Sequence, residues 1–253
     1  MPARTTVLIL QHVDVEKPGL ILDALDGSGL DVVVRNLLDG EPAPGAAGEL
    51  PAVDELAGLV VMGGPMSADD VDAHPALKAE RDLLVDALRA EVPTLGVCLG
   101  AQLLARAQGL AVRSGAELGR DGEIGWAPLR GVDRDDPVVG PLADAPAVLH
   151  WHGDRIVPGP DTRVLARTDS TECQAFRAGP VAWGLQFHLE VTPELLDEWL
   201  GEPSFVAEAT HALGPDAVGR LRGDARAVAD TLRPLAGRGL AHLRSLFVER
   251  AGF

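Results

Sequence analysis

Cys98 has the residue type and the local spacing of a covalent nucleophile. It lies between Gly96 and Gly100, where a short apolar run gives way to a helical pattern. A nucleophile on a tight strand-to-helix turn is held clear of the sheet in a strained backbone conformation, which requires small neighbours. The amino end of the next helix, at Leu99, favours the thiolate over the thiol. Taken alone, the pattern also suits a small buried cysteine in a tight turn.

His188 and Glu190 supply the groups that such a nucleophile needs. They lie in segment 184–190, which alternates apolar and polar residues as an extended strand does. Side chains two residues apart in a strand share a face, so this pair projects to the same side. A carboxylate so placed can orient an imidazole that serves Cys98 as base and acid. A histidine in a strand is commonly a surface or core residue, but this combination predicts a Cys98–His188–Glu190 triad.

Gly63 and Gly64, followed by Pro65, end a third apolar run. Glycines at that point let the backbone approach a substrate carbonyl and offer an N–H group. The predicted oxyanion hole therefore consists of the backbone amides of Gly64 and Leu99. By itself the sequence Gly-Gly-Pro indicates only a sharp turn, and its expected position beside the strand of Cys98 is what gives it a role.

The elements around these residues alternate between strand and helix. Strand-like runs occur at 7–10, 31–35, 59–62 and 94–97, and helical patterns at 18–29, 75–89 and 99–108. Residues 41–50 are rich in Pro, Gly and Ala and predict a loop. This alternation predicts an α/β fold with a mainly parallel central sheet and helices on both faces, with the site at the carboxyl ends of the strands.

The second half of the chain changes character twice. Residues 112–187 hold shorter β-type runs, which predict a mixed sheet edge or a small β-layer. Beyond Pro193 the pattern is helical, and the helices expected there lie at 194–200, 204–213 and 215–247, with the last broken near 234–239. We therefore predict one domain over 1–200 and a helical C-terminal extension, 201–253, packed on the same domain.

Composition and charge narrow the classes of partner. The chain has 253 residues, 46% of them hydrophobic, and a formal net charge of −16. That charge argues against nucleic acid or an anionic membrane as partner, because both attract clustered Lys and Arg. Residues 1–6 have no signal-peptide pattern, and no run approaches the length of a membrane span.

The cysteine and histidine usage bears on compartment and metals. Only Cys98 and Cys173 occur, without a C-x-x-C pair, which suits a reducing cytoplasm and argues against a disulfide framework or a zinc site. No His/Asp/Glu cluster other than His188–Glu190 has ligand spacing, so we expect no metal and no cofactor. Cys173 is expected to be structural or incidental.

Three segments resemble the motifs of class I glutamine amidotransferases. Residues 92–102 (VPTLGVCLGAQ) resemble the nucleophile block of that family, 62–65 (MGGP) its oxyanion strand, and 184–190 (GLQFHLE) its His-Glu block. Their order and spacing match over about residues 50–195. The resemblance implies a flavodoxin-like fold, a glutamine or γ-glutamyl substrate, and the roles of nucleophile, base and orienting carboxylate for Cys98, His188 and Glu190.

The same resemblance assigns the substrate-binding residues. The glutamine side chain and its α-groups are held, by this likeness, at Gln102 and at the loop His152-Gly153-Asp154, with Gly63 beside them. Further segments are similar to a stand-alone, GMP-synthase-like branch. Two departures argue against GMP synthesis itself. Leu189 stands where GMP synthases carry proline, and the chain has no nucleotide-binding loop of an ATP-pyrophosphatase unit.

Three functions follow from this pattern. The first is a glutaminase-type amidotransferase that hands ammonia to a separate synthetase subunit. The second is a partner-independent γ-glutamyl peptidase or hydrolase. The third is a non-catalytic binding module on the same scaffold, against which the intact Cys-His-Glu set argues. His12 and Glu16, after the first strand, are expected either to shape the mouth of the pocket or to belong to a solvated loop.

Overall fold

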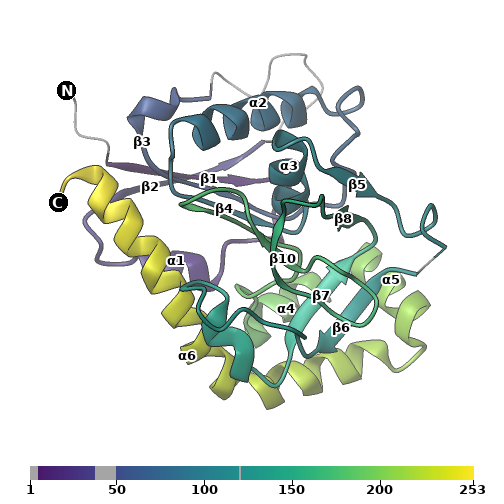
Figure 1. Ribbon diagram of the computed structural model, residues 1–253. Helices are drawn as coiled ribbons and strands as arrows, with labels where there is room; N and C mark the ends of the chain where they lie inside the picture. Colours follow the sequence, from purple (N-terminus) through teal and green to yellow (C-terminus); the bar gives the residue numbers. More distant parts are fainter. Residues whose placement is uncertain (1–4, 38–49, 120) are drawn as a thin grey trace.

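The computed structural model describes residues 5–37, 50–119 and 121–253 (Figure 1). The loop predicted at 41–50 therefore lies outside the described residues, except for Leu50. Of residues 1–6, which have no signal-peptide pattern, residues 1–4 also lie outside them.

The first half of the described chain alternates strands and helices as predicted. Its elements are β1 (Thr6–Gln11), α1 (Leu20–Leu25), β2 (Asp31–Asn36), η1 (Val53–Glu55), β3 (Leu56–Val61), α2 (Pro75–Arg89), β4 (Thr94–Val97) and α3 (Leu99–Ala107). The second half consists of β5 (Ala111–Arg113), β6 (Glu123–Ala127), η2 (Gly140–Asp144), β7 (Val148–His152), β8 (Arg155–Val157), β9 (Arg163–Ala166), β10 (Ala175–Arg177), β11 (Ala182–Leu185), α4 (Pro193–Trp199), α5 (Pro203–Leu213) and α6 (Ala217–Ala251).

The central sheet has seven strands in the order β2-β1-β3-β4-β11-β10-β9. The first five are parallel, and β10 runs antiparallel to both of its neighbours. The shorter β-type runs thus form both of the predicted arrangements. β9 and β10 make a mixed sheet edge, while β5–β8 and β6–β7 form two small antiparallel pairs.

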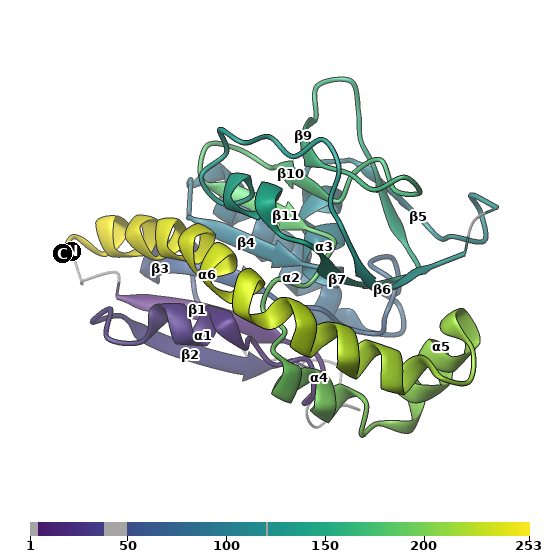
Figure 2. The same ribbon diagram turned by 90° about the horizontal axis from the view of Figure 1, so that it is seen from below.

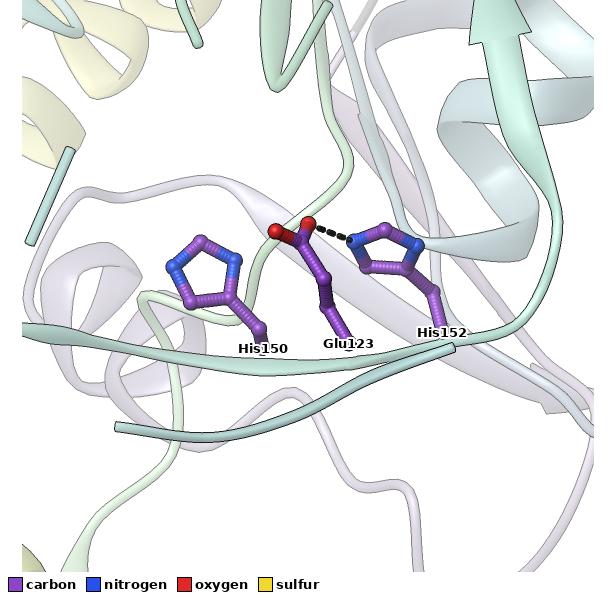
Figure 3. Close-up of side chains that lie close together, drawn as sticks. All are labelled: Glu123, His150 and His152. Atoms are coloured by element: carbon purple, nitrogen blue, oxygen red, sulfur yellow. Dashed lines mark ion pairs between the residues drawn. The ribbon is translucent and has the colours of Figure 1, made fainter. Parts of the chain in front are cut away.

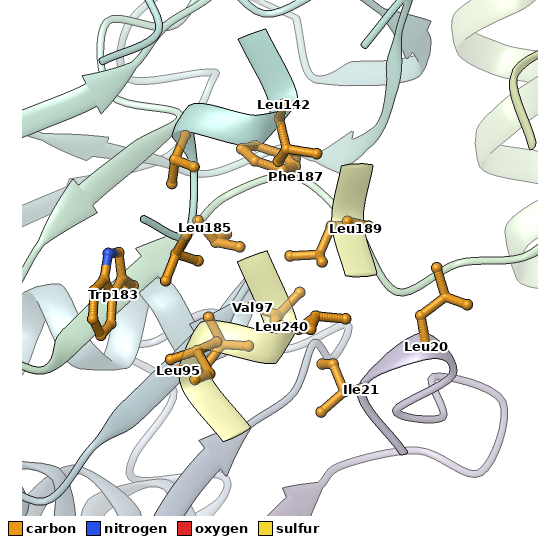
Figure 4. Packing of buried hydrophobic residues seen from close by; sticks show 14 of the residues in the cluster. Leu20, Ile21, Leu95, Val97, Leu142, Trp183, Leu185, Phe187, Leu189 and Leu240 are labelled. Carbon is orange, nitrogen blue, oxygen red and sulfur yellow. The ribbon is translucent and has the colours of Figure 1, made fainter. Parts of the chain in front are cut away.

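Helices cover both faces of the sheet. Successive side chains of a strand point to opposite faces, so a strand that is apolar on both faces, such as β1, needs a helical layer on each side. Val7 and Ile9 of β1 pack in one cluster with α1, α6 and η2, whereas Leu8 and Leu10 pack on the other face with α2 and α3. Figure 2 shows α6 running across the first of these faces, and Figure 4 shows Val97 of β4 in the same layer as Leu240 of α6.

The predicted break of the last helix near 234–239 is wrong. α6 is one helix of 35 residues with Pro234 inside it, and it bends along its length in Figure 1. A proline removes one intrahelical hydrogen bond and usually bends the helix. Pro234 is exposed, so water can satisfy the freed carbonyl, while Leu232 and Leu235 on either side are buried in the sheet cluster. Packing on both sides therefore keeps the helix continuous.

The C-terminal helices share clusters with the rest of the chain. Leu240 and Phe247 of α6 pack with the sheet, and Ala209 of α5 packs in a third cluster with Leu149 and Trp151 of β7. The boundary between a domain over 1–200 and an extension over 201–253 stays a prediction. The buried contacts are of the kind expected for an extension packed on the same domain.

Candidate active site

Cys98 lies at the tip of the turn between β4 and α3, in a strained backbone conformation. Its φ of 51° and ψ of −107° place it in a region that residues other than glycine rarely adopt. A Cβ atom added at Gly96 would lie 2.5 Å from the Gly100 carbonyl oxygen, and one added at Gly100 would lie 2.0 Å from the Val61 carbonyl oxygen. The close approach of strand and helix therefore requires both glycines, as the sequence predicted.

His188 and Glu190 form a buried hydrogen-bonded pair. Nδ1 of His188 lies 2.7 Å from Oε1 of Glu190, and each side chain is 1% exposed. The two residues follow β11, which ends at Leu185, and the His188 N–H donates to the Leu149 carbonyl of β7 at 2.8 Å. Burial opposes the charge on His188, but Glu190 and the nearby Cys98 outweigh it and raise the pKa of the imidazole well above its usual value.

The sulfur of Cys98 faces the same pocket as the His188 ring. The thiol donates to the Trp151 carbonyl at 3.5 Å, and Nε2 of Gln186 lies 3.9 Å from the sulfur. Cys98 and His188 both line this pocket, and Cys98 is among the groups that raise the pKa of His188. The three predicted triad residues are thus brought together by two separate stretches of chain, the turn between β4 and α3 and the segment that follows β11.

The backbone amides predicted for the oxyanion hole flank this sulfur. Gly64 lines the pocket with Cys98, and Leu99 begins α3 directly after it. Within the described residues, no hydrogen bond takes up the N–H of either Gly64 or Leu99. Gly63 lies behind them, and its carbonyl accepts a hydrogen bond from Nδ1 of His12 at 2.8 Å.

Four of the five predicted substrate-binding residues line the pocket, and Gly63 is not among its lining residues. Gln102, one turn along α3 from Cys98, lines the pocket together with His152, Gly153 and Asp154. Nδ1 of His152 donates to the Asp154 carbonyl at 3.0 Å, and the Asp154 carboxylate accepts from Ser67 at 3.1 Å. These bonds hold the His-Gly-Asp loop in a defined conformation at the pocket.

His12 and Glu16 are buried rather than part of a solvated loop. Nε2 of His12 lies 2.9 Å from the Glu80 carboxylate, with both side chains fully buried. Burial opposes the charge on His12, but Glu80 and the Gly63 carbonyl outweigh it and raise its pKa. Glu16 lines the pocket, and burial raises its pKa to about 7, although the neighbouring His188 and His12 act in the opposite direction.

Glu123, His150 and His152 form a cluster that the sequence spacing did not reveal (Figure 3). One nitrogen or oxygen of each lies within 4.8 Å of the others, because Glu123 and His152 are cross-strand neighbours in β6 and β7. Oε2 of Glu123 lies 3.1 Å from Nε2 of His152, and the carboxylate also accepts hydrogen bonds from Thr168, Ser170 and Gln174.

The donors of this cluster make it a hydrogen-bonded network rather than an open ligand set. Burial opposes the ionisation of Glu123, but the hydrogen bonds from His152, Ser170 and Thr168 outweigh it and hold its pKa well below its usual value. Burial lowers the pKa of His150 to about 4, which keeps that ring neutral. Both oxygens of Glu123 are engaged, so the network braces the loop that follows β7.

The pocket has a volume of about 810 Å³ and a wall that the sequence did not indicate. Trp199 of α4 and Phe205 and Glu208 of α5 line it, beside Trp151. The aromatic rings contact one another, with centroids 5.9 Å apart for Trp151–Trp199 and 5.2 Å for Trp199–Phe205. No motif marks Trp199, Phe205 or Glu208, because they come from helices whose sequence shows only an ordinary helical pattern.

The mainly parallel sheet with helices on both faces defines an α/β protein of the amidotransferase type. The family described as glutamine amidotransferase class-I matches residues 39–206, which is more than half of the chain. The chain belongs to the class I glutamine amidotransferase family.

Individual relatives agree with this. The chain is 30% identical over 193 residues to the glutamine amidotransferase-like protein YfeJ of Salmonella typhimurium, covering 74% of this chain and 76% of that protein. It is 33% identical over 144 residues to a glutamine-hydrolyzing GMP synthase subunit of Halobacterium salinarum, covering 56% of this chain and 70% of that relative. A solved glutamine amidotransferase from Thermotoga maritima superposes with a TM-score of 0.79 at 26% identity, over 95% of this chain and 98% of that one.

Two further observations bear on the surroundings of the protein. Among the helices of the described residues, none combines the length and the apolar composition that crossing a bilayer requires. Cys98 and Cys173 are both buried free thiols. Burial, and secondarily Glu172, raises the pKa of Cys173 to about 12, so that thiol stays protonated at neutral pH.

Proposed function

We propose that the protein hydrolyses the γ-amide of glutamine or of a γ-glutamyl compound through a covalent γ-glutamyl thioester on Cys98. The observation that carries this proposal is the meeting of a strained cysteine at a helix amino terminus with a buried His188–Glu190 pair in one pocket. Membership of the class I family supports glutamine as the parent substrate.

In the proposed first half-reaction, the Cys98 thiol gives its proton to His188, and the resulting thiolate attacks the γ-carbonyl carbon. The negative charge that develops on the carbonyl oxygen is stabilised by the N–H groups of Gly64 and Leu99. The C–N bond then breaks, and protonated His188 gives its proton to the leaving nitrogen, so that ammonia or an amine departs and the thioester remains.

The second half-reaction consumes one water molecule. Neutral His188 takes a proton from water as the oxygen attacks the thioester carbon, and the C–S bond breaks to release glutamate and restore the sulfur. Glu190 supports both halves because it holds the imidazole ring in one orientation and stabilises its charged form. Gln102 and the loop His152-Gly153-Asp154 are proposed to hold the α-groups of the substrate.

Two versions of this activity differ in the fate of the nitrogen. In the glutaminase version, ammonia passes to a separate synthetase, as the name of the Halobacterium salinarum relative suggests for that protein. In the alternative, the protein hydrolyses larger γ-glutamyl amides without a partner. A pocket of about 810 Å³ favours the alternative, because cavities of this size hold ligands larger than a free amino acid.

The free thiols suit action in a reducing compartment such as the cytoplasm.

The test combines turnover with labelling. Purified protein is assayed with glutamine and with γ-glutamyl amides for release of glutamate, and a diazo-ketone analogue of glutamine is used to label the nucleophile. We expect partner-free glutamate release that Cys98→Ala abolishes and the control Cys173→Ala leaves intact, with the label on Cys98. Glutamate release that survives in Cys98→Ala, or label on Cys173, would refute the proposal. Ammonia release that needs an added synthetase would support the glutaminase version.

A further inference from the structure

The proposed active-site pocket is lined by carboxylates, and protonated His188 supplies positive charge beside them. Among the described residues that line it, none is Lys or Arg. Its acidic lining residues are Asp14, Glu16, Asp70, Asp154, Glu202 and Glu208. Several of these bond to the protein, since Asn36 donates to Asp14, a backbone N–H to Asp70 and Ser67 to Asp154.

Glu16 differs from the other acids because it is buried and its carboxyl group, among the described residues, makes no hydrogen bond or ion pair, although the charges of His188 and His12 act on it. Its side chain belongs to a residue that is 6% exposed, and no hydrogen bond or ion pair joins its carboxyl group to any other residue in the described part of the chain. A Cβ atom added at Gly63 would lie 2.1 Å from Oε2 of Glu16 and 3.3 Å from Cε1 of His188. The unpartnered carboxyl group therefore lies beside the imidazole, at the pocket.

Even with His188 and His12 nearby, an ionised carboxyl group in this position is costly, because burial outweighs their effect and raises its pKa. Burial raises the pKa of Glu16 to about 7, so the group is close to half ionised at neutral pH. A cation bound next to it would favour the ionised form and offset the cost of burial. Glu208 adds a second negative charge nearby, since it is one of the groups that raise the pKa of Glu16.

Aromatic rings complete this part of the pocket. Trp151 donates from Nε1 to the Glu208 carboxylate at 2.9 Å, which holds that carboxylate against the wall. The Trp199 ring stands perpendicular to the His188 ring with centroids 5.0 Å apart, and Phe205 packs on Trp199. Carboxylates combined with aromatic faces form the surroundings that bind organic ammonium groups, through charge and through cation–π attraction.

The position next to His188 identifies which part of a substrate meets these groups. His188 has to reach the leaving nitrogen to protonate it, so the leaving group lies on the side of the sulfur where Glu16, Glu208 and the Trp199 ring lie. We propose that this subsite binds a leaving amine that carries a second, positively charged nitrogen, so that γ-glutamyl conjugates of diamines and polyamines are the preferred substrates. This inference rests on the proposed function and names its substrate class.

The reaction remains the hydrolysis described above. The γ-carbonyl–nitrogen bond breaks, His188 protonates that nitrogen, and the diamine leaves while its distal ammonium keeps its charge throughout. A γ-glutamyl dipeptide would instead bring a carboxylate to the acidic wall, where like charges repel. An alkylamine without a second nitrogen would leave Glu16 unpaired.

The test compares three conjugates of similar length. They are γ-glutamyl-1,4-diaminobutane, γ-glutamyl-n-pentylamine, in which a methyl group replaces the ammonium, and γ-glutamyl-4-aminobutyrate, which carries a carboxylate. We expect kcat/KM for the diamine conjugate to exceed that for the pentylamine conjugate by about tenfold or more, which corresponds to roughly 1.4 kcal/mol. The aminobutyrate conjugate should be the slowest, and the preference should shrink at high salt because screening weakens the attraction.

Two variants and a matched control locate the effect. Glu16→Gln and Glu208→Gln should each lower the ratio of diamine to pentylamine kcat/KM at least threefold. Glu249→Gln removes the same charge from an exposed position near the end of α6 and should leave that ratio unchanged. If Glu16→Gln does not fold, the ratio of diamine to pentylamine kcat/KM in Glu208→Gln tests the inference, because Glu208 is exposed. Equal rates for the diamine and pentylamine conjugates, or a preference that both pocket variants keep, would overturn the inference.

Binding to Cys98→Ala separates this inference from the proposed function. Calorimetry with this variant reports affinity without turnover. If the wild type hydrolyses no conjugate while Cys98→Ala binds the diamine conjugate about tenfold more tightly than the pentylamine one, the subsite is supported and the proposed activity is refuted. If glutamine is hydrolysed but the two conjugates bind and react alike, the activity stands and the cationic subsite is wrong.

Discussion

Nδ1 of His188 and Oε1 of Glu190 lie 2.7 Å apart with both side chains almost completely buried. Removing two ionisable groups from water is unfavourable unless they pair, and this pair satisfies one nitrogen of the ring while the ring also adjoins Cys98. The distance therefore links the local i, i+2 pattern of the sequence to the proposed acid–base chemistry.

Glu190→Gln should lower kcat by about 10²- to 10⁴-fold, because the ring loses both its orientation and its charge partner. Glu190 raises the pKa of His188, so its loss lowers that pKa. The alkaline limb of the pH–rate profile, where His188⁺ loses its proton, should then move to lower pH. Glu194→Gln, which changes the same charge at an exposed position on α4, should leave both kcat and the profile unchanged. An unshifted profile in Glu190→Gln would rule out this role.

The relative positions of Cys98, His188 and Glu190 could be predicted because each depends on a local pattern. A glycine-flanked cysteine between a strand and a helix, and a His-x-Glu sequence in an extended segment, fix side-chain directions without reference to distant chain. The sheet and its parallel order follow similarly from alternating strands and helices. The family resemblance then supplied the expectation of a glutamine or γ-glutamyl substrate.

Features that depend on contacts between distant segments could not be read in the same way. Glu123 and His152 adjoin only because β6 and β7 pair, and no spacing in the chain expresses that pairing. The aromatic wall depends on where α5 packs. The unbroken α6 shows packing prevailing over the local tendency of Pro234 to end a helix.

Glu16 predicts a pH-dependent stability. Its folded pKa of about 7 lies above the ordinary value of 4.5, so the folded state holds a proton that the unfolded state has lost between these values. The stability that this proton confers is complete below about pH 4.5 and is lost as the pH rises towards 7, by about 3 kcal/mol at most.

Urea unfolding of Glu16→Gln and of the wild type at pH 5 and pH 8 measures this loss. The glutamine at position 16 cannot ionise. The free energy of unfolding of the variant minus that of the wild type should therefore increase from pH 5 to pH 8. Glu249→Gln should follow the wild type at both values. A difference between Glu16→Gln and the wild type that does not change with pH would show that the carboxyl group is not buried in the folded state.

Gly100→Ala and Gly237→Ala should have opposite effects although both glycines lie in helices. A Cβ at Gly100 would lie 2.0 Å from the Val61 carbonyl oxygen, so α3 would have to move away from β3, at a cost of about 3 kcal/mol. A Cβ at Gly237 meets nothing within 4 Å, and alanine there should stabilise α6 by about 0.5–1 kcal/mol. Thermal unfolding of both variants checks this, and Gly100→Ala should also lose activity because the turn at Cys98 shifts. Wild-type stability in Gly100→Ala would show that the helix does not approach the strand this closely.

Leu240→Ala tests whether the C-terminal helix belongs to the same folding unit as the sheet. Leu240 is 3% exposed and packs in the cluster that contains Val97 and Leu185, the residues that end β4 and β11 beside the proposed site. Truncating it should lower the free energy of unfolding by about 2–5 kcal/mol, in a single cooperative transition. Leu22→Ala, at a position on α1 that is 36% exposed, should change it by less than about 0.5 kcal/mol. If Leu240→Ala instead costs less than about 1 kcal/mol, or α6 melts in a separate earlier transition, the extension is a peripheral element, and the strands that position Cys98 and His188 do not depend on it.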